Sequence, residues 1–181
     1  MIEHYARTLG PPDSAQDGDL ATIAEPLDFL GVNYYFPERV AAEPLGFERV
    51  APQLPLTAMG WEQDVSAFHD LVARFGRGYG DVPFWITENG AAMQDTVAGG
   101  TVDDPDWIAY LRDHLDAVTA ARAGGVDIRR RYFLWSLLDN FEWAHGYRPR
   151  FGIVRVDFET QERIPKGSAA WYRDRIANAR A

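Results

Sequence analysis

The sequence contains no cysteine among its 181 residues, which excludes disulfides, a thiol nucleophile and thiolate metal ligands. Basic residues are also few, because 18 Lys and Arg stand against 27 Asp and Glu, a formal net charge of −9. Nucleic acids and anionic membranes attract basic patches, so we expect neither as a partner. No apolar run approaches the ~20 residues of a membrane span. The N-terminus lacks the basic and apolar segments of a signal peptide, and we expect a cytoplasmic protein.

Aromatic residues are abundant: the chain has 6 Trp, 8 Tyr and 10 Phe. Such rings build hydrophobic cores, but they also line clefts that stack against sugar rings, and composition alone leaves both interpretations open. The histidines share no spacing typical of metal ligands, and we expect neither a metal nor a cofactor. They are His4, His69, His114 and His145.

Short apolar runs alternate with segments of helical periodicity along the chain. We expect buried strands at 27–35, 83–87 and 131–138, and helices at 61–75, from Asp103 or Asp104 to 123, and at 166–179. A helix end within the first ten residues, loops at 13–19 and 41–60, and a hairpin across 153–164 complete the prediction. Continuous apolar strands alternating with amphipathic helices predict parallel β/α units, in either a doubly wound sheet or a barrel.

Polar and aromatic side chains follow each predicted strand, at the edge where such folds carry their functional groups. Glu88 ends an apolar strand, where a rigidly held carboxylate suits a nucleophile of glycosyl transfer. Its alternative role is that of a turn residue before Asn89 and Gly90. Strand alternation puts Asn33 and Tyr35 on one face, where they could orient a carboxylate or bind a sugar hydroxyl. An ordinary aromatic strand is the alternative there.

The segment 135–143 combines two indoles with carboxylates. Sugars are bound by ring stacking and by bidentate carboxylate contacts, and Glu142 beside Trp143 fits that task. A core tryptophan and a solvated glutamate are the alternative for these positions.

Four stretches together resemble the C-terminal part of a family 1 glycoside hydrolase, the β-glucosidase family with a (β/α)₈ TIM barrel. They occur in family order: DFLGVNYY (28–35), GWE (60–62), ITENGAA (86–92) and FLWSLLDNFEWAHGYRPRFGIVRVDFETQERIPKGSAAWY (133–172). The ITENG and WSLLDNFEW–GY–RFG blocks, in the third and fourth stretches, are highly specific as a pair.

The resemblance implies that Glu88 is the catalytic nucleophile and that Tyr35 hydrogen-bonds and positions it, with Asn33 nearby in the sugar site. Glu142 matches the residue that grips the 4- and 6-hydroxyls of the sugar. A carboxylate here would repel a phosphate, and no lysine lies between 139 and 149. We therefore expect an unphosphorylated β-D-glucoside or a close epimer as substrate.

The family's aromatic subsites also have counterparts. Trp135 resembles the platform under the sugar ring, and Trp143 lines the same subsite. Trp61 resembles an aromatic wall of the aglycone site, to which Phe151 contributes. After Trp61 the chain departs from the family's Pro-Gly pattern and reads EQDVSAF. Six further residues are expected to hold the strand-end loops and the hairpin: Asp139, Asn140, Arg150, Asp157, Arg163 and Lys166.

The family's acid/base residue lies in an Asn-Glu-Pro sequence, which does not occur in this chain. A TIM barrel typically needs ~250 residues. We therefore expect residues 1–181 to be an α/β, C-terminal fragment of one barrel, without a second domain, that supplies about the last three β/α units, strands six to eight.

Two functional hypotheses follow. In the first, the chain belongs to a retaining hydrolase of terminal β-D-glucosidic bonds that acts on a β-glucoside or small oligosaccharide. The missing N-terminal barrel half is then encoded by the same gene, supplied by a second chain of a split enzyme, or absent altogether. The isolated chain is expected to be inactive. In the second, the chain is catalytically inert and serves as a sugar-binding or assembly partner.

Overall fold

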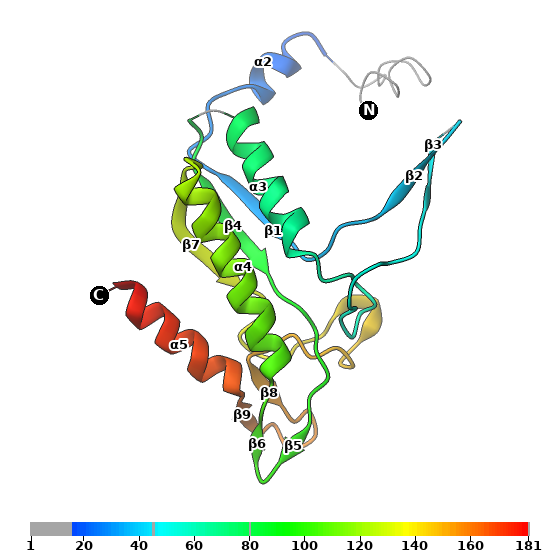
Figure 1. Ribbon diagram of the computed structural model, residues 1–181, viewed down its shortest axis with the longest axis vertical. Helices are drawn as coiled ribbons and strands as arrows, with labels where there is room; N and C mark the ends of the chain where they lie inside the picture. The colour runs from blue at the N-terminus through cyan, green and yellow to red at the C-terminus, as the bar shows by residue number, and fades with distance from the viewer. Residues whose placement is uncertain (1–15, 45, 80, 181) are drawn as a thin grey trace.

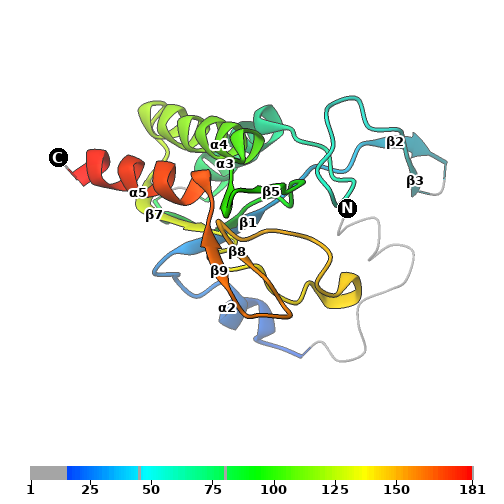
Figure 2. The ribbon, with the colours of Figure 1, turned by 90° about the horizontal axis from the view of Figure 1, so that it is seen from below.

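The computed structural model describes residues 16–44, 46–79 and 81–180. A parallel three-stranded sheet has the order β1–β4–β7, and its strands span Leu30–Tyr34, Phe84–Asn89 and Ile128–Leu134. Three long helices follow these strands in the chain: α3 (Val65–Gly78), α4 (Pro105–Ala123) and α5 (Gly167–Arg180). Helices α3 and α4 lie side by side on one face of the sheet (Figures 1 and 2). The predicted parallel β/α units are therefore confirmed.

Smaller elements occupy the connections: α2 (Asp19–Ile23), β2 (Val40–Glu43), β3 (Gly46–Arg49), β5 (Val97–Ala98), β6 (Thr101–Val102), the 3₁₀ turn η1 (Trp143–His145), β8 (Val154–Val156) and β9 (Arg163–Pro165). Strands β8 and β9 pair antiparallel, which confirms the predicted hairpin. Strands β2 and β3 form a hairpin that extends away from the body of the molecule (Figure 1). The expectation of a plain loop at 41–60 was therefore wrong for the hairpin and correct for residues 50–60. The helix end expected in the first ten residues lies outside the described residues.

The main core lies between the sheet and helices α3 and α4. Its buried residues are Val32, Tyr34, Phe68, Val72, Phe84, Ile86, Ala121 and Ile128. A second core cluster involves α4, α5 and the strand-end loops, and it consists of Ala91, Met93, Trp107, Tyr110, Leu111 and Ile153. Apolar side chains at the spacing that the sequence showed thus supply the free energy that holds the helices on this face.

The opposite face of the sheet is open. Phe29 stacks on Trp85 at a centroid distance of 4.1 Å, and the Arg131 guanidinium lies 5.6 Å from the Trp85 ring. Phe29 is nevertheless 40 % exposed and Phe133 50 % exposed. Large apolar side chains of one sheet face are therefore left without a covering layer within the described residues.

Two predicted boundaries were wrong for identifiable reasons. Asp64 Oδ1 accepts a 2.9 Å hydrogen bond from the Ala67 N–H and so caps α3, which places Trp61 in the loop before the helix. The third strand ends at Leu134, and a cis peptide bond joins Trp135 to Ser136. Among the described residues, no helix is long and apolar enough to cross a membrane.

The predicted start of α4 is correct, although the side chain at that position does not cap the helix. Asp104 stands at the N-cap with Pro105 in the first turn, yet its carboxylate makes no cap hydrogen bond. It accepts 2.7 and 2.6 Å hydrogen bonds from the Ser168 N–H and Oγ instead. Asp104 therefore joins α4 to the first turn of α5.

Candidate active site

Tyr35 and Glu88 meet at the carboxyl ends of the adjacent strands β1 and β4. The Tyr35 hydroxyl donates a 2.5 Å hydrogen bond to Glu88 Oε2. Burial raises the pKa of the Tyr35 phenol well above its usual value, and the hydrogen bond to Glu88 raises it further. The phenol therefore stays protonated and remains a donor to one oxygen of the Glu88 carboxylate.

Two aromatic rings contact Tyr35, and a third packs on one of them. The edge of Trp61 approaches the Tyr35 ring at a centroid distance of 5.6 Å, and Phe36 stacks on Trp61 at 4.7 Å. Phe151 lies 6.2 Å from Tyr35 and 5.9 Å from Trp61. Trp61 is half-buried, whereas Phe151 is only 2 % exposed and offers no surface for an aglycone. Phe151 therefore supports Trp61 and Tyr35 from behind, in contrast to the expected wall position.

Asn33 lies one strand position before the Tyr34–Tyr35 pair, on the open face of the sheet. Its Oδ1 accepts a 2.6 Å hydrogen bond from the Thr87 hydroxyl. Tyr34 points to the other face, where it packs against Phe68 at 4.9 Å. This arrangement agrees with the predicted alternation, and it places Asn33 beside the residue that precedes Glu88.

The segment after β7 brings Trp135 and Glu142 to the same edge of the sheet. The backbone N–H of Trp135 donates a 2.9 Å hydrogen bond to the backbone carbonyl of Asn89, the residue next to Glu88. The charge of Glu142 contributes, after burial and Glu88, to the raised pKa of Tyr35 and so acts on the same phenol. Both side chains are half-buried. Trp143 opens η1 with a φ of 44° and is 80 % exposed, so its indole stands free at the rim.

Gly90 permits the close contact between the ends of β4 and β7. A Cβ atom at this position would lie 1.8 Å from the carbonyl oxygen of Trp135. Only glycine therefore allows the backbone after Glu88 to reach the backbone of Trp135.

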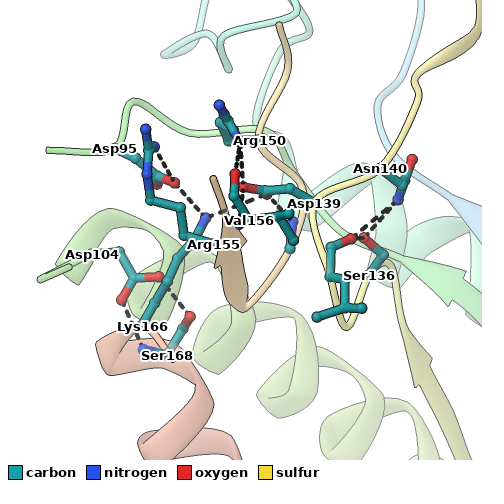
Figure 3. A network of polar contacts seen from close by, with 12 residues as sticks. Asp95, Asp104, Ser136, Asp139, Asn140, Arg150, Arg155, Val156, Lys166 and Ser168 are labelled. Carbon is teal, nitrogen blue, oxygen red and sulfur yellow. Dashed lines mark hydrogen bonds and ion pairs between the residues drawn. The ribbon is translucent and has the colours of Figure 1, made fainter. Parts of the chain in front are cut away.

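A buried ionic network supports these strand-end loops (Figure 3). Asp139 accepts hydrogen bonds from Arg150 Nη1 at 2.9 Å and from the Gly152 and Val156 N–H groups at 3.0 and 3.2 Å. Lys166, which is 2 % exposed, places Nζ 2.7 Å from Asp95 Oδ2 and 3.9 Å from Asp139 Oδ1. The loop after β4, the loop after β7 and the start of α5 are thus held together.

The other predicted supporting residues make local contacts. Asn140 Nδ2 donates to Ser136 Oγ at 3.0 Å, and Asp157 Oδ1 accepts from the N–H groups of Glu159 and Thr160. Arg163 donates to the carbonyl of Gln161. The structural role expected for these residues agrees with their contacts.

Asn89 was not singled out from the sequence, although it lies within the ITENGAA stretch. It is fully buried, and its Nδ2 donates to the carbonyl of Tyr34 at 2.8 Å and to the Tyr110 hydroxyl at 3.1 Å. The Tyr132 hydroxyl donates to Asn89 Oδ1. Asn89 therefore joins all three strands directly beside Glu88. A polar residue two positions beyond the predicted apolar strand was the available signal.

An open cavity of about 560 Å³ lies elsewhere, between α3, α4 and the loop at 55–58, and none of the predicted site residues lines it. Within the part of the chain that the structure describes, no three His, Asp or Glu side chains are grouped to hold a metal ion. The site at the strand ends thus combines the Glu88 carboxylate, which the Tyr35 phenol orients, with the Glu142 carboxylate and with indole rings. Such groups suit attack on an electrophilic carbon and the binding of hydroxyl groups.

The chain as a whole is similar to proteins of a known family. The chain is 45 % identical to the 1,4-beta-D-glucan glucohydrolase of Thermotoga neapolitana over 98 % of its length, and 43 % identical to a bifunctional beta-D-glucosidase/beta-D-fucosidase of Bifidobacterium breve over 90 %. It spans about 40 % of the length of each. The crystal structure of a beta-glucosidase from Exiguobacterium marinum superposes with a TM-score of 0.92 at 41 % identity, and covers 100 % of this chain and 42 % of that one. The sequence model of glycosyl hydrolase family 1 matches residues 2–181. The chain therefore belongs to glycosyl hydrolase family 1.

Proposed function

We propose that this chain supplies the nucleophile and part of the sugar site of a retaining β-glucosidase. The observation that carries the proposal is the 2.5 Å hydrogen bond from the Tyr35 hydroxyl to Glu88. A carboxylate with one oxygen held by a neutral donor has its other oxygen aligned for attack, and a permanently protonated phenol cannot compete for the substrate's carbon. The names of the relatives support β-glucosidic bonds as the substrate class.

In the first step, Glu88 forms a bond to the anomeric carbon while the bond from that carbon to the aglycone oxygen breaks. The electron pair leaves with the aglycone oxygen, which takes a proton from an acid outside this chain. In the second step, water attacks the anomeric carbon, its proton returns to that same acid/base group, and the bond to Glu88 breaks. Retaining enzymes place the two carboxyl groups roughly 5–5.5 Å apart.

The remaining predicted residues are assigned to substrate binding. Glu142 binds the 4- and 6-hydroxyls, Trp135 stacks under the sugar ring, and Trp143 lines the same subsite from its exposed position. Asn33 lies near the sugar hydroxyls. The carboxylate of Glu142 favours an unphosphorylated sugar, because a phosphate would be repelled at that position.

The open sheet face supports completion of the site by further barrel units. Strands β1, β4 and β7 then correspond to strands six to eight of a (β/α)₈ barrel, and the first five units cover Phe29, Phe133 and the free edges of β1 and β7. These units come from the same gene or from a second chain. The same open face also fits an inert assembly partner, which is the second candidate function. The cytoplasmic location expected from the sequence stays a prediction.

Covalent labelling tests the nucleophile in this chain directly. A 2-deoxy-2-fluoro-β-D-glucoside with a dinitrophenyl leaving group needs no acid assistance. We therefore expect a glycosyl ester at Glu88, detected by peptide mass spectrometry, even though the isolated chain does not hydrolyse ordinary glucosides. Glu88→Gln should remain unlabelled, and Glu159→Gln, at an exposed hairpin position, should label like the unaltered chain.

The complete site is tested in a chimera in which this chain replaces the matching 40 % of the Thermotoga neapolitana glucohydrolase. We expect the chimera to hydrolyse aryl β-D-glucosides and to ignore their 6-phosphates. Labelling in the chimera alone would show that the chain needs the remaining units. Absence of labelling at Glu88 in both proteins would contradict the proposed function and favour the inert partner.

A further inference from the structure

Arg39, Glu62 and Asp64 form a polar clamp next to Trp61. Arg39 Nε donates to Glu62 Oε1 and Oε2 at 2.9 and 2.8 Å, and Arg39 Nη2 donates to Asp64 Oδ2 at 3.0 Å. Glu62 Oε1 also accepts hydrogen bonds from the Gln53 and Leu54 N–H groups at 2.7 and 2.8 Å. Glu62 is only 4 % exposed, so its charge depends on these donors.

The clamp joins three segments that are separate in sequence. Arg39 follows β1, Gln53 and Leu54 belong to the loop that follows the β2–β3 hairpin, and Glu62 and Asp64 precede α3. Charge-assisted and forked hydrogen bonds of this kind fix both distance and direction. The backbone on the C-terminal side of Trp61 is therefore held at Glu62.

The clamp also reaches the residue next to Tyr35. The Tyr34 hydroxyl donates a 2.6 Å hydrogen bond to the carbonyl of Asp64. Tyr34 precedes Tyr35 and Glu62 follows Trp61 in the chain. The clamp therefore contacts a direct neighbour of each ring in the Trp61–Tyr35 pair. The distance of 5.6 Å between these two rings is thus set from both sides.

We infer that Arg39 and Glu62 are positioning residues that determine how Trp61 meets the group leaving from the sugar, and hence the choice of aglycone. The inference rests on the proposed function, in which Trp61 borders the aglycone site. Phe36 covers one face of Trp61 and Tyr35 meets its edge, so the indole has little freedom except at its half-exposed surface. Release of the clamp would let this surface tilt, while the Tyr35–Glu88 hydrogen bond stays intact.

Glu62→Gln is the sharpest test, because the amide keeps the shape of the side chain but turns an N–H₂ group toward Arg39. In the chimera, we expect kcat/KM for aryl β-glucosides to fall about tenfold or more, mainly through KM. We expect kcat/KM for β-glucosyl fluoride to stay unchanged, because a fluorine atom does not reach Trp61. Loss of fold would lower both values together.

Two further variants define the clamp as a unit. Arg39→Lys keeps the charge but cannot span Glu62 and Asp64, and it should show the same selective loss even where Glu62→Gln folds poorly. The control is Arg49→Gln, which breaks the exposed 2.6 Å ion pair with Glu38 on the neighbouring hairpin and should change neither substrate.

The position of Trp61 is also measured without turnover in the 181-residue chain. The near-ultraviolet circular dichroism of Trp61, obtained by subtracting the Trp61→Phe spectrum, should weaken in Glu62→Gln and not in Arg49→Gln. An inactive chimera would count against the proposed function but leave this readout intact. An unchanged Trp61 signal, or equal losses for aryl glucosides and glucosyl fluoride in a variant that keeps its fold, would overturn the inference.

Discussion

The Tyr35 hydroxyl donates a 2.5 Å hydrogen bond to Glu88, although 53 residues separate them. The contact exists because β1 and β4 are parallel neighbours, so their carboxyl ends meet at one edge of the sheet. It gives the carboxylate a fixed direction before any ligand binds.

Tyr35→Phe should therefore slow catalysis in the chimera without unfolding it. Removal of a hydrogen bond to a charged group costs about 1.5–3 kcal/mol, which corresponds to about 10- to 100-fold in kcat. Steady-state kinetics with an aryl β-glucoside measure the effect. Tyr79→Phe, an exposed tyrosine at the end of α3, is the matched control and should leave kcat unchanged. An unaltered kcat in Tyr35→Phe would contradict the role of the phenol.

Gly90→Ala should destabilise the chain strongly, because the new Cβ would lie 1.8 Å from the Trp135 carbonyl oxygen and neither backbone can retreat without breaking the sheet. We expect a loss of more than about 3 kcal/mol in the free energy of unfolding, measured by urea denaturation. Gly78→Ala is the control, since a Cβ there has nothing within 4 Å. Equal stability of the two variants would disprove the close contact.

Lys166→Met should leave Asp95 as a buried carboxylate whose nearest remaining cation is Arg155, 3.5 Å away (Figure 3). Breaking a buried ion pair costs about 3–5 kcal/mol. The double variant Asp95→Asn with Lys166→Met should recover part of this loss, because no uncompensated charge remains. Arg173→Met, which breaks an exposed pair with Asp174, should cost less than about 1 kcal/mol. Urea denaturation of these proteins and of the single variant Asp95→Asn decides, and additive losses in the double variant would argue against the network.

His114 should make the folded chain less stable as the pH falls. Burial lowers the pKa of His114 to about 4, whereas an unfolded histidine titrates near 6.5. Between these values the unfolded chain binds a proton that the folded chain does not, so the free energy of unfolding decreases toward acid.

Urea midpoints measured between about pH 7 and pH 5 test this, and the decrease should become shallower in His114→Gln than in the unaltered chain. His69→Gln, on the half-exposed face of α3, should keep the full decrease. The same pH dependence in all three proteins would show that His114 is not its source.

Sequence reasoning identified residues that lie at strand ends better than it placed the boundaries of the elements. Glu88, Tyr35 and Glu142 were identified as strand-end groups, and the structure brings Tyr35 to Glu88. Trp61 was assigned to a helix because its apolar spacing continues that of α3, but the cap at Asp64 starts the helix later. Phe151 was expected to contribute to the aromatic wall of the aglycone site, but it is buried against Trp61, because ring spacing in sequence carries no information on depth.

The sequence by itself determined the alternation of strands and helices, the open polar ends of those strands, and membership of the family that these motifs mark. These properties are local, since apolar periodicity selects which face is buried. Only the tertiary structure decided that Arg39 binds Glu62, that Lys166 neutralises Asp95, and that Asn89 joins three strands. Such contacts depend on register, including the shift between Val32 and Asn33, and on the close backbone approach at Gly90. Register is set by the packing of distant segments, so no local pattern can specify it.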